Sequence, residues 1–314
     1  MTTLSFDASG VVRRFVVALA VRYRACLLFV ATAVVMGCGY VAIRVGTETV
    51  PPAFLAAVRF DLSAAILLSY AVTRGRWYPQ ARADVAAILL LGGLVFAGTI
   101  GFLFVGQQYT TASTAAIVMS LGPVLTALVA SALVPEECLS RTDALGVGLG
   151  LVGAVVLVYP SPGGIDGGMG VVFVLCAVVC SSLGTVLLSL LETTLSTPAL
   201  TGWGALLGGL VLHLVSVGLA EPVGTVRWQP GAVVAVLYLA VVVSVGGYVA
   251  YLLLLAEVGP ARSSLTSYAS PVVATVVGWS ILGEVVTAVT LLGFFVTTAG
   301  FVATNWSLID GRSR

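Results

Sequence analysis

Arg59 and Asp61 are two ionisable residues that stand almost side by side in a long apolar stretch of this 314-residue chain. If a helix begins at Pro52, Arg59 lies about 10 Å into an apolar layer about 30 Å thick. An ionisable group at that depth usually faces the interior of a helix bundle or a cavity. Residues two apart point to different sides of a helix, so we expect Arg59 and Asp61 to have separate partners. Arg59 would then contact a substrate or, alternatively, be anchored to carbonyl groups or to the outer interface.

A proline and a glutamate recur at one spacing. Pro123 and Glu136 are thirteen residues apart, and so are Pro271 and Glu284, with the two copies offset by about half the chain. A proline inside a helix removes a backbone donor and frees carbonyl groups. In a membrane such irregular backbone is tolerated where it is packed in protein or lines a cavity. We therefore interpret both prolines as hinge or cavity-wall positions, with a simple packing kink as the alternative.

Further polar and aromatic side chains complete the candidates for a cavity. Aromatic groups with a polar handle suit a cavity that holds small amphiphilic molecules, although helix packing explains each of them singly. Gln107 belongs either to the lip of such a cavity or to a short outer loop. We assign no role to His213. The candidate cavity residues are Tyr40, Arg59, Gln107, Ser120, Pro123, Trp203, Tyr248, Tyr251, Tyr268 and Pro271.

Several kinds of chemistry have little support. Gly148, Gly150 and Gly153 fit G-x-G-x-x-G, but they lie in an apolar run with no soluble strand before it, so helix packing explains them better than dinucleotide binding. The five cysteines are an odd number and the chain has one histidine, which argues against a disulfide framework and a metal site. We expect no cofactor, no metal and no enzymatic activity.

The composition indicates which elements must position these residues. The chain is 59% hydrophobic and 9% charged, whereas soluble domains carry about 25% charged residues. Helices that span a membrane bond their backbone N–H and C=O groups internally, so the composition predicts an all-α membrane protein. Apolar runs of spanning length predict ten transmembrane helices. They lie near 25–46, 52–73, 84–105, 112–134, 142–160, 168–191, 198–219, 230–255, 261–283 and 286–307.

The arginines predict the orientation. All fourteen basic residues are arginine, and a cytoplasmic N-terminus places most of them in cytoplasmic segments, as the positive-inside rule requires. Ten helices in two equal halves give five helices per half, so the second half must enter the membrane from the opposite side. The repeats are therefore inverted, with Glu136 at the cytoplasmic face and Glu284 at the outer face. Such repeats alternate access to a site between them.

The pattern resembles the EamA-type branch of the drug/metabolite transporter superfamily. Gly39-Tyr-Val-Ala-Ile-Arg44, then Pro51-Pro52, then Ala57-Val-Arg59 follow the order of that family's first two helices, and the Pro–Glu stretch with its downstream glycines occurs twice. The resemblance covers about residues 25–307. It implies a first EamA repeat (25–160) and a second repeat (168–307). The arginines before residue 25 indicate a basic cytoplasmic arm (1–24), the glycines and prolines between the repeats an outer linker (161–167), and the last residues form a cytoplasmic tail (308–314).

The resemblance also implies a function: a secondary transporter, as an exporter of amino acids, related metabolites or lipophilic compounds. Four-helix relatives couple transport to protons through a glutamate in their first helix. Here that helix has none, and Asp61 is the clear mid-span acid that remains as a coupling group. The alternatives are an exchanger of phosphorylated sugars or nucleotide-sugars, and a membrane scaffold or sensor without transport.

The expected partners follow from this reading. We expect a small-molecule substrate and the lipid bilayer, and no nucleic acid. The protein should be a multi-pass protein of the plasma membrane with both termini cytoplasmic. The sequence leaves open whether it forms a homodimer.

Overall fold

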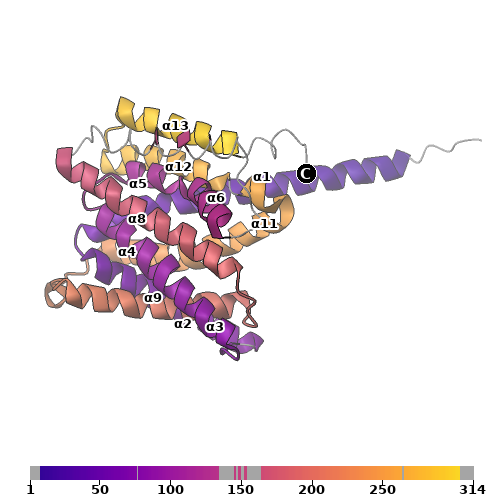
Figure 1. Cartoon of the computed structure of the whole chain (residues 1–314). Helices are drawn as coiled ribbons and strands as arrows, with labels where there is room; N and C mark the ends of the chain where they lie inside the picture. The colour runs from indigo at the N-terminus through magenta and orange to yellow at the C-terminus, as the bar shows by residue number, and fades with distance from the viewer. Residues whose placement is uncertain are drawn as a thin grey trace, which may run out of the picture.

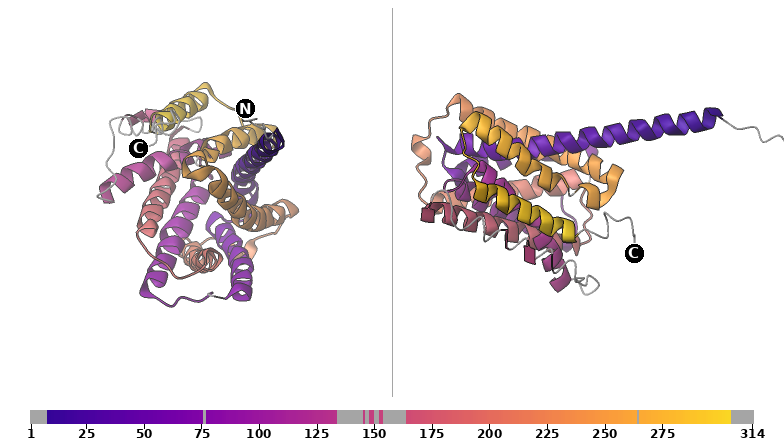
Figure 2. Two further views of the ribbon diagram at one scale, coloured as in Figure 1. Left: turned by 90° about the vertical axis from the view of Figure 1, so that its right-hand side faces the viewer. Right: turned by 90° about the horizontal axis from the view of Figure 1, so that it is seen from above.

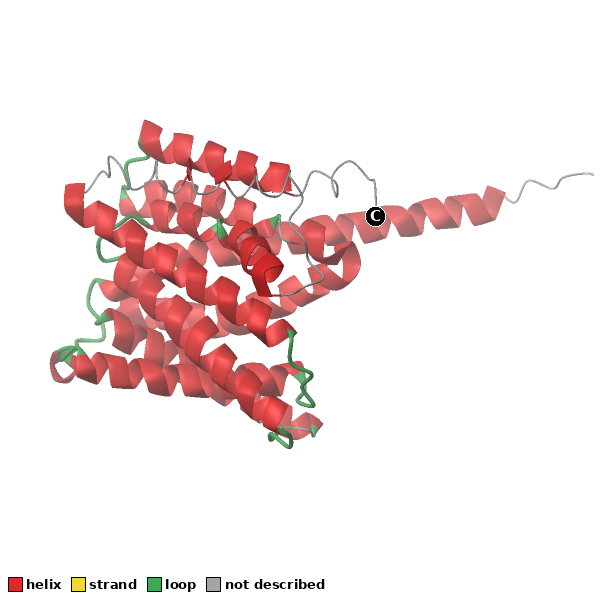
Figure 3. Ribbon diagram, in the orientation of Figure 1, coloured by secondary structure: helices red, strands yellow, loops and turns green. Residues whose placement is uncertain are grey.

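The computed structural model describes residues 8–75, 77–133, 164–263 and 265–304, together with 145, 148, 149, 152 and 153. The described residues form helices joined by turns and loops, and none of them lies in a strand (Figure 3). Seven helical segments are long and apolar enough to cross a membrane: 23–47, 52–74, 82–106, 112–133, 168–189, 197–218 and 230–258. The chain is therefore a multi-pass α-helical membrane protein.

The helices follow one another as Figure 1 labels them. They are α1 (Ala8–Thr47), α2 (Pro52–Arg74), α3 (Arg82–Leu89), η1 (Leu90–Gly98), α4 (Thr99–Gly106), α5 (Ala112–Met119), α6 (Gly122–Leu133), α8 (Gly164–Ser189), α9 (Thr197–Gly218), η2 (Val223–Thr225), α10 (Pro230–Leu237), η3 (Tyr238–Gly247), α11 (Tyr248–Ser263), α12 (Thr266–Leu282) and α13 (Ala288–Thr304).

Most of the predicted spans have a counterpart. The seven candidate spans match seven of the predicted runs to within three residues at each end, because the apolar runs end at charged or turn residues. The helices α12 and α13 occupy the last two predicted runs. The predicted span 142–160 lies almost entirely outside the described residues. The helix α1 continues through the predicted arm from Ala8 onward, and its N-terminal part projects beyond the bundle (Figures 1 and 2).

The bundle has two ends, which we name after the limits of α2. At the Pro52 end, α1, α4, α9 and α12 finish and α2, α5 and α10 begin. Three hydrogen bonds connect the helices there: Arg44 to Gln107, Ala53 to Glu221, and Ala112 to Glu284. At the Arg74 end, α2, α8 and α11 finish and α3, α9 and α12 begin, with Asp84 bonded to Thr194.

Two stretches of π-helix stand at equivalent places. The segment η1 begins at Leu90 and η3 begins at Tyr238, which is 148 residues later. The same offset separates Pro123 from Pro271. A π-helix is rare and often marks a functional site, because the wider turn changes the direction of side chains and loosens the carbonyl ladder. The internal repetition of the sequence is therefore also present in the backbone.

The two repeated prolines have different local structures. The helix around Pro123 is broken: α5 ends at Met119 and α6 begins at Gly122. Pro271 lies inside the uninterrupted helix α12, although a turn precedes that helix at Leu265. A break thus stands just before the first proline, and a helix start stands one turn before the second. The break before Pro123 fits the missing proline donor, whereas α12 continues through Pro271.

Small residues bring α9 close to its neighbours. A Cβ atom added to Gly92 of η1 would lie 2.8 Å from the carbonyl oxygen of Gly204 and 2.8 Å from Leu207 Cβ. A Cβ added to Gly208 would lie 2.9 Å from Phe96 Cβ. In a membrane, where lipid is as apolar as a leucine side chain, such close backbone contact is a main source of helix association.

This packing predicts the effect of Gly92→Ala. The new methyl group meets backbone and cannot be accommodated by a rotamer change, so we expect a loss of about 1–3 kcal/mol in stability. Gly93→Ala is the matched control on the same π-helix, because a Cβ there has open space within 4 Å. Thermal unfolding in detergent should give a lower midpoint for Gly92→Ala only. Equal midpoints for the two variants would contradict the packing argument.

Candidate functional site

A cavity of about 360 Å³ lies among α2, η1, α9 and η3. This volume is within the range of pockets for small molecules. It is lined by Met36, Arg59, Phe60, Ser63, Leu67, Leu91, Val95, Phe96, Thr99, Ile100, Leu188, Thr197, Leu200, Thr201, Ala205, Val243, Ser244 and Tyr248. Most of this lining is apolar, with hydroxyl groups and one guanidinium distributed over it.

The two π-helical regions contribute equivalent residues to the cavity. Val95 and Val243 are 148 residues apart, and so are Phe96 and Ser244. Ile100 and Tyr248, at the beginning of α4 and α11, form a third pair with this offset. Both repeats thus present the same three positions to one cavity. This is the arrangement expected of a site at an interface between two repeats.

Arg59 is the charged residue of this lining. It is 7% exposed, and its Nε donates a hydrogen bond to Ser244 Oγ at 3.3 Å. Its guanidinium carbon lies 5.1 Å from the centre of the Phe60 ring. The ion pairs among the described residues join Arg24 to Glu257 and His213 to Asp61, so neither involves Arg59. Arg59 therefore places a positive charge in the cavity without a carboxylate beside it in the described part of the chain.

The hydroxyl groups near Arg59 bond to backbone carbonyls. Ser63 Oγ donates to the carbonyl of Arg59 at 2.8 Å. Ser244 Oγ donates to the carbonyl of Leu239 at 2.9 Å, five residues earlier in the same π-helix. Thr99 Oγ lies 3.4 Å from the carbonyl of Leu94, also five residues earlier. The wide turns of both π segments thus leave carbonyls that side chains satisfy.

The cavity extends toward the Arg74 end of the bundle. Its lining there includes Leu188 near the end of α8 and Thr197 at the start of α9.

At the Pro52 end, Glu221 accepts hydrogen bonds from the backbone N–H groups of Ala53 and Phe54, both at 3.0 Å. A carboxylate is favoured at a helix N-terminus, where unpaired donors and the helix dipole attract negative charge. Glu221 therefore joins the chain after α9 to the beginning of α2.

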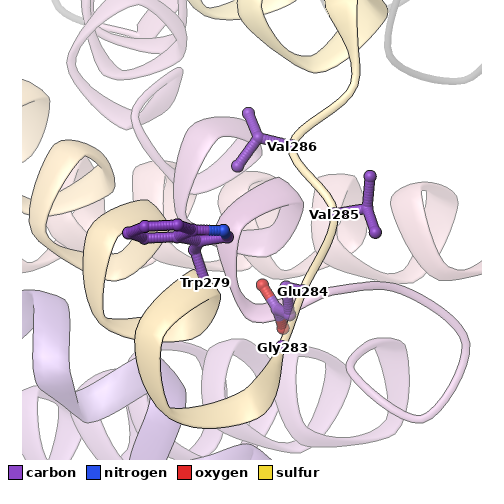
Figure 4. A pocket seen from close by; sticks show the side chains of 5 residues that line it. All are labelled: Trp279, Gly283, Glu284, Val285 and Val286. Carbon is purple, nitrogen blue, oxygen red and sulfur yellow. The ribbon is translucent and has the colours of Figure 1, made fainter.

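Glu284 makes the same kind of contact to α5. Its carboxylate accepts from the backbone N–H of Ala112 at 2.7 Å, and from the N–H and the hydroxyl of Ser113 at 3.2 and 2.7 Å. The helix α12 ends at Leu282, and Gly283 has a left-handed φ of 65°, which suits glycine and turns the chain back. Figure 4 shows Glu284 on this turn, below Trp279 at a hollow on the surface. Glu136, the equivalent residue, lies outside the described residues.

Gln107 lies at the Pro52 end of the bundle. Its backbone carbonyl accepts a hydrogen bond from Nη1 of Arg44. The residue is 0% exposed, and its side-chain amide has no hydrogen-bond partner among the described residues. The structure thus places Gln107 in the buried turn after α4, and it is not among the residues that line the cavity.

Asp61 and His213 form a pair. Asp61 Oδ2 lies 2.8 Å from His213 Nε2, and the side chains are 45% and 36% exposed. A Cβ on Gly209 would lie 2.8 Å from Asp61 Oδ1, so the glycine makes room for the carboxylate. Arg59 and Asp61 therefore do face different neighbours. The side chain of Asp61, the predicted coupling acid, is directed at α9 and is not among the residues that line the cavity.

The other predicted residues are distributed between the cavity and the packing around it. Tyr248 lines the cavity together with Arg59. Trp203 donates from Nε1 to the carbonyl of Trp77 at 2.7 Å and stacks on its ring, which places it at the Arg74 end beside the cavity. Tyr40 packs against the main core. Tyr251 is half-buried on α11.

The residues around the two prolines lie in packed regions. Ser120 is 1% exposed and donates to the carbonyl of Ile117 at 2.6 Å. Tyr268 is 7% exposed in α12, and Pro271 is buried in the same helix. Pro123 is half-buried in the first turn of α6. None of these four residues lines the described cavity.

Sequence reasoning missed the hydroxyl groups of the cavity and the role of His213. Ser63, Thr99, Thr201 and Ser244 look like ordinary small polar residues in apolar runs. For Ser244 the sequence holds one signal, its position in the repeat: it lies 148 residues after Phe96, the same offset as between Pro123 and Pro271. His213 had no signal of its own, because its partner lies in another helix.

The Asp61–His213 contact predicts coupled mutations. Residues in direct contact show interaction energies of about 0.5–3 kcal/mol in a double-mutant cycle. We expect Asp61→Asn and His213→Gln to be non-additive in detergent unfolding. Asp61→Asn combined with Glu284→Gln is the control, because those two carboxylates share no partner, and their effects should add. Additive effects in both cycles would mean that the Asp61–His213 contact contributes no interaction free energy to stability.

The comparisons with known proteins agree with this architecture. The model of the EamA-like transporter family matches residues 23–159 and again residues 168–306. The uncharacterized inner membrane transporter YedA of Escherichia coli K12 is 30% identical over 266 residues, 84% of each chain. A probable amino-acid metabolite efflux pump of Salmonella typhimurium LT2 is 30% identical over 278 residues, 85% of this chain and 90% of that one.

Two further relatives extend the comparison. A WAT1-related chloroplastic protein of Arabidopsis thaliana is 28% identical over 282 residues, which cover 86% of this chain and 66% of that protein. One crystal structure has the same fold with a TM-score of 0.61, covering 92% of this chain at 20% identity. The family and the names of these relatives point to transport rather than to enzymatic activity. With two matches that together cover most of its length, the chain belongs to the EamA-like transporter family.

Proposed function

We propose that this protein is a secondary transporter that exports small metabolites, such as amino acids or lipophilic compounds, by alternating access between two repeats. One observation supports this most. A cavity is lined at equivalent positions by both repeats and extends toward one end of the bundle, while hydrogen bonds of Glu221 and Glu284 connect helices at the other end. Alternating access requires such a site, because each repeat must close one end while the other opens.

The proposal includes ten helices in two inverted five-helix repeats. The direction of the equivalent helices supports inversion: α5 begins at the Pro52 end, whereas the equivalent helix α12 finishes there beside it. The pairing of η1 with η3 supports the same division. The tenth helix of the proposal is the predicted span 142–160, which lies almost entirely outside the described residues.

The arginine distribution orients the proposed transporter. Residues of the Arg74 end, including Arg74 and Arg82, fit a cytoplasmic location, as both termini do. The described cavity then extends toward the cytoplasm, and the contacts of Glu221 and Glu284 close the outer end. This arrangement is an inward-facing state. An exporter would load its substrate in that state.

The name of one relative and the cavity itself support the class of substrate. The Salmonella relative is called a probable amino-acid metabolite efflux pump. A single guanidinium among mostly apolar groups fits a small, weakly charged molecule. A phosphorylated sugar carries more negative charge and is usually held by several cations, so the exchanger alternative has less support.

The closed outer end predicts a result for Glu284→Ala. Hydrogen bonds to a charged group contribute about 1.5–3 kcal/mol, and each 1.4 kcal/mol changes a population about tenfold. Loss of the Glu284 contacts should therefore raise the outward-open fraction about tenfold. A cysteine at Ser244 in a cysteine-free background, labelled in sealed vesicles with an impermeant reagent from either side, reports this change.

The expected pattern separates a transporter from a scaffold. Without the Glu284 change, labelling at position 244 should be faster from the cytoplasmic side; Glu284→Ala should accelerate labelling from the outer side. Glu48→Ala is the control, since Glu48 is an exposed acid at the same end of the bundle. Labelling from one side only, unaffected by Glu284→Ala in folded protein, would leave a membrane scaffold or sensor as the better account.

A further inference from the structure

The chemistry of the cavity points to a narrower class of substrate, an inference that rests on the proposed transport function. The charged group in the described lining is Arg59, and the lining contains no aspartate or glutamate. The remaining groups are hydroxyls, aromatic rings and aliphatic side chains. The cavity is therefore positive at one point and apolar over most of its surface.

The guanidinium of Arg59 has donors left for a ligand. It carries five N–H groups in a rigid planar fork. The hydrogen bond of this side chain within the described structure uses Nε, which donates to Ser244 Oγ at 3.3 Å. The Phe60 ring, 5.1 Å away, offers the cation a π face but accepts no pair of hydrogen bonds. The four N–H groups on the two Nη atoms can therefore serve a bound molecule.

A cation in this position favours the binding of an anionic ligand. Arg59 is 7% exposed and lies within a membrane-spanning helix, where an unpaired charge is costly and is normally neutralised by a partner. The described ion pairs of the chain give it none. A carboxylate matches the guanidinium fork with two parallel hydrogen bonds. A ligand with one negative charge would thus neutralise the cavity.

The apolar part of the cavity accommodates the remainder of such a ligand. Phe60 and Phe96 stack with ring centres 5.0 Å apart and both line the cavity. Leu91 and Val95 continue this surface on the π-helix η1. A flat ring or a short hydrocarbon chain is complementary to these groups, since aromatic rings favour offset stacking and edge contacts.

A free amino group has no counterpart in this lining. An ammonium group is normally met by a carboxylate, and the residues of the described lining offer only hydroxyl and carbonyl oxygens. We propose that the cavity binds small monocarboxylates with an aromatic or apolar tail, with Arg59 pairing with the carboxylate. It should prefer them over the corresponding amino acids.

The test uses four probes of similar size and different charge: 3-phenylpropionate, phenylalanine, phenethylamine and 3-phenyl-1-propanol. Binding to the detergent-purified full chain is measured by calorimetry, with thermal stabilisation as a second readout. We expect 3-phenylpropionate to bind about tenfold or more tightly than any of the others, because its carboxylate forms charge-assisted bonds that the neutral alcohol lacks. Tighter binding of phenylalanine or phenethylamine, or binding of none of the four, would overturn the inference.

Variants of Arg59 identify the site. In Arg59→Gln we expect the affinity for 3-phenylpropionate to fall about tenfold to a hundredfold. Arg59→Lys should retain part of the affinity, because it keeps the charge and loses the fork. His213→Gln is the control, since His213 is a histidine of the same bundle that pairs outside this cavity. Unchanged affinity in Arg59→Gln contradicts the role of Arg59, and should that variant fail to fold, the preference of the native protein among the four probes still decides.

The result is distinguishable from failure of the proposed function. A protein whose labelling at position 244 alternates between sides but which binds phenylalanine better is a transporter of another substrate class. A protein that binds 3-phenylpropionate but is never labelled from the outer side has the site without transport.

Discussion

A buried positive charge in an apolar bundle is the constraint on which the rest of this structure depends. Arg59 stands within a membrane-spanning helix and is almost fully buried, beside Ser244 of one π-helix and facing the cavity that the other π-helix also lines. Keeping such a charge from lipid requires polar groups or a cavity around it. The π-helices η1 and η3 both line that cavity, and η3 supplies the Ser244 hydroxyl that accepts a hydrogen bond from Arg59.

Two carboxylates of the described structure act at the ends of helices. Glu221 and Glu284 each satisfy backbone donors at the start of a helix from the other repeat, α2 and α5, at the Pro52 end. Contacts of this kind are localised and moderate in energy. Glu284, which marks the duplication in the sequence, is thus also a bond between the repeats.

The sequence predicted the membrane class and the spans well, because apolar length and charged ends are local properties. It also placed Arg59 and Asp61 on different sides of α2. It did not predict the π-helices, since no residue type marks them, nor the pairing of Asp61 with His213, since that contact joins residues far apart in the chain. Of the ten candidate cavity residues, Arg59 and Tyr248 line the described cavity. Trp203 instead donates to the backbone carbonyl of Trp77, a contact that depends on tertiary packing, and Ser120 donates to the carbonyl of Ile117, three residues earlier.

The most direct test of the central claim is counterflow in proteoliposomes. The purified full chain is reconstituted in vesicles loaded with unlabelled 3-phenylpropionate, and uptake of the radiolabelled compound is followed in native protein and in Arg59→Gln. The account predicts transient accumulation that depends on the internal load and is lost in the variant. Uptake no faster than in protein-free vesicles, although the native protein binds the compound, would contradict a transport cavity around Arg59.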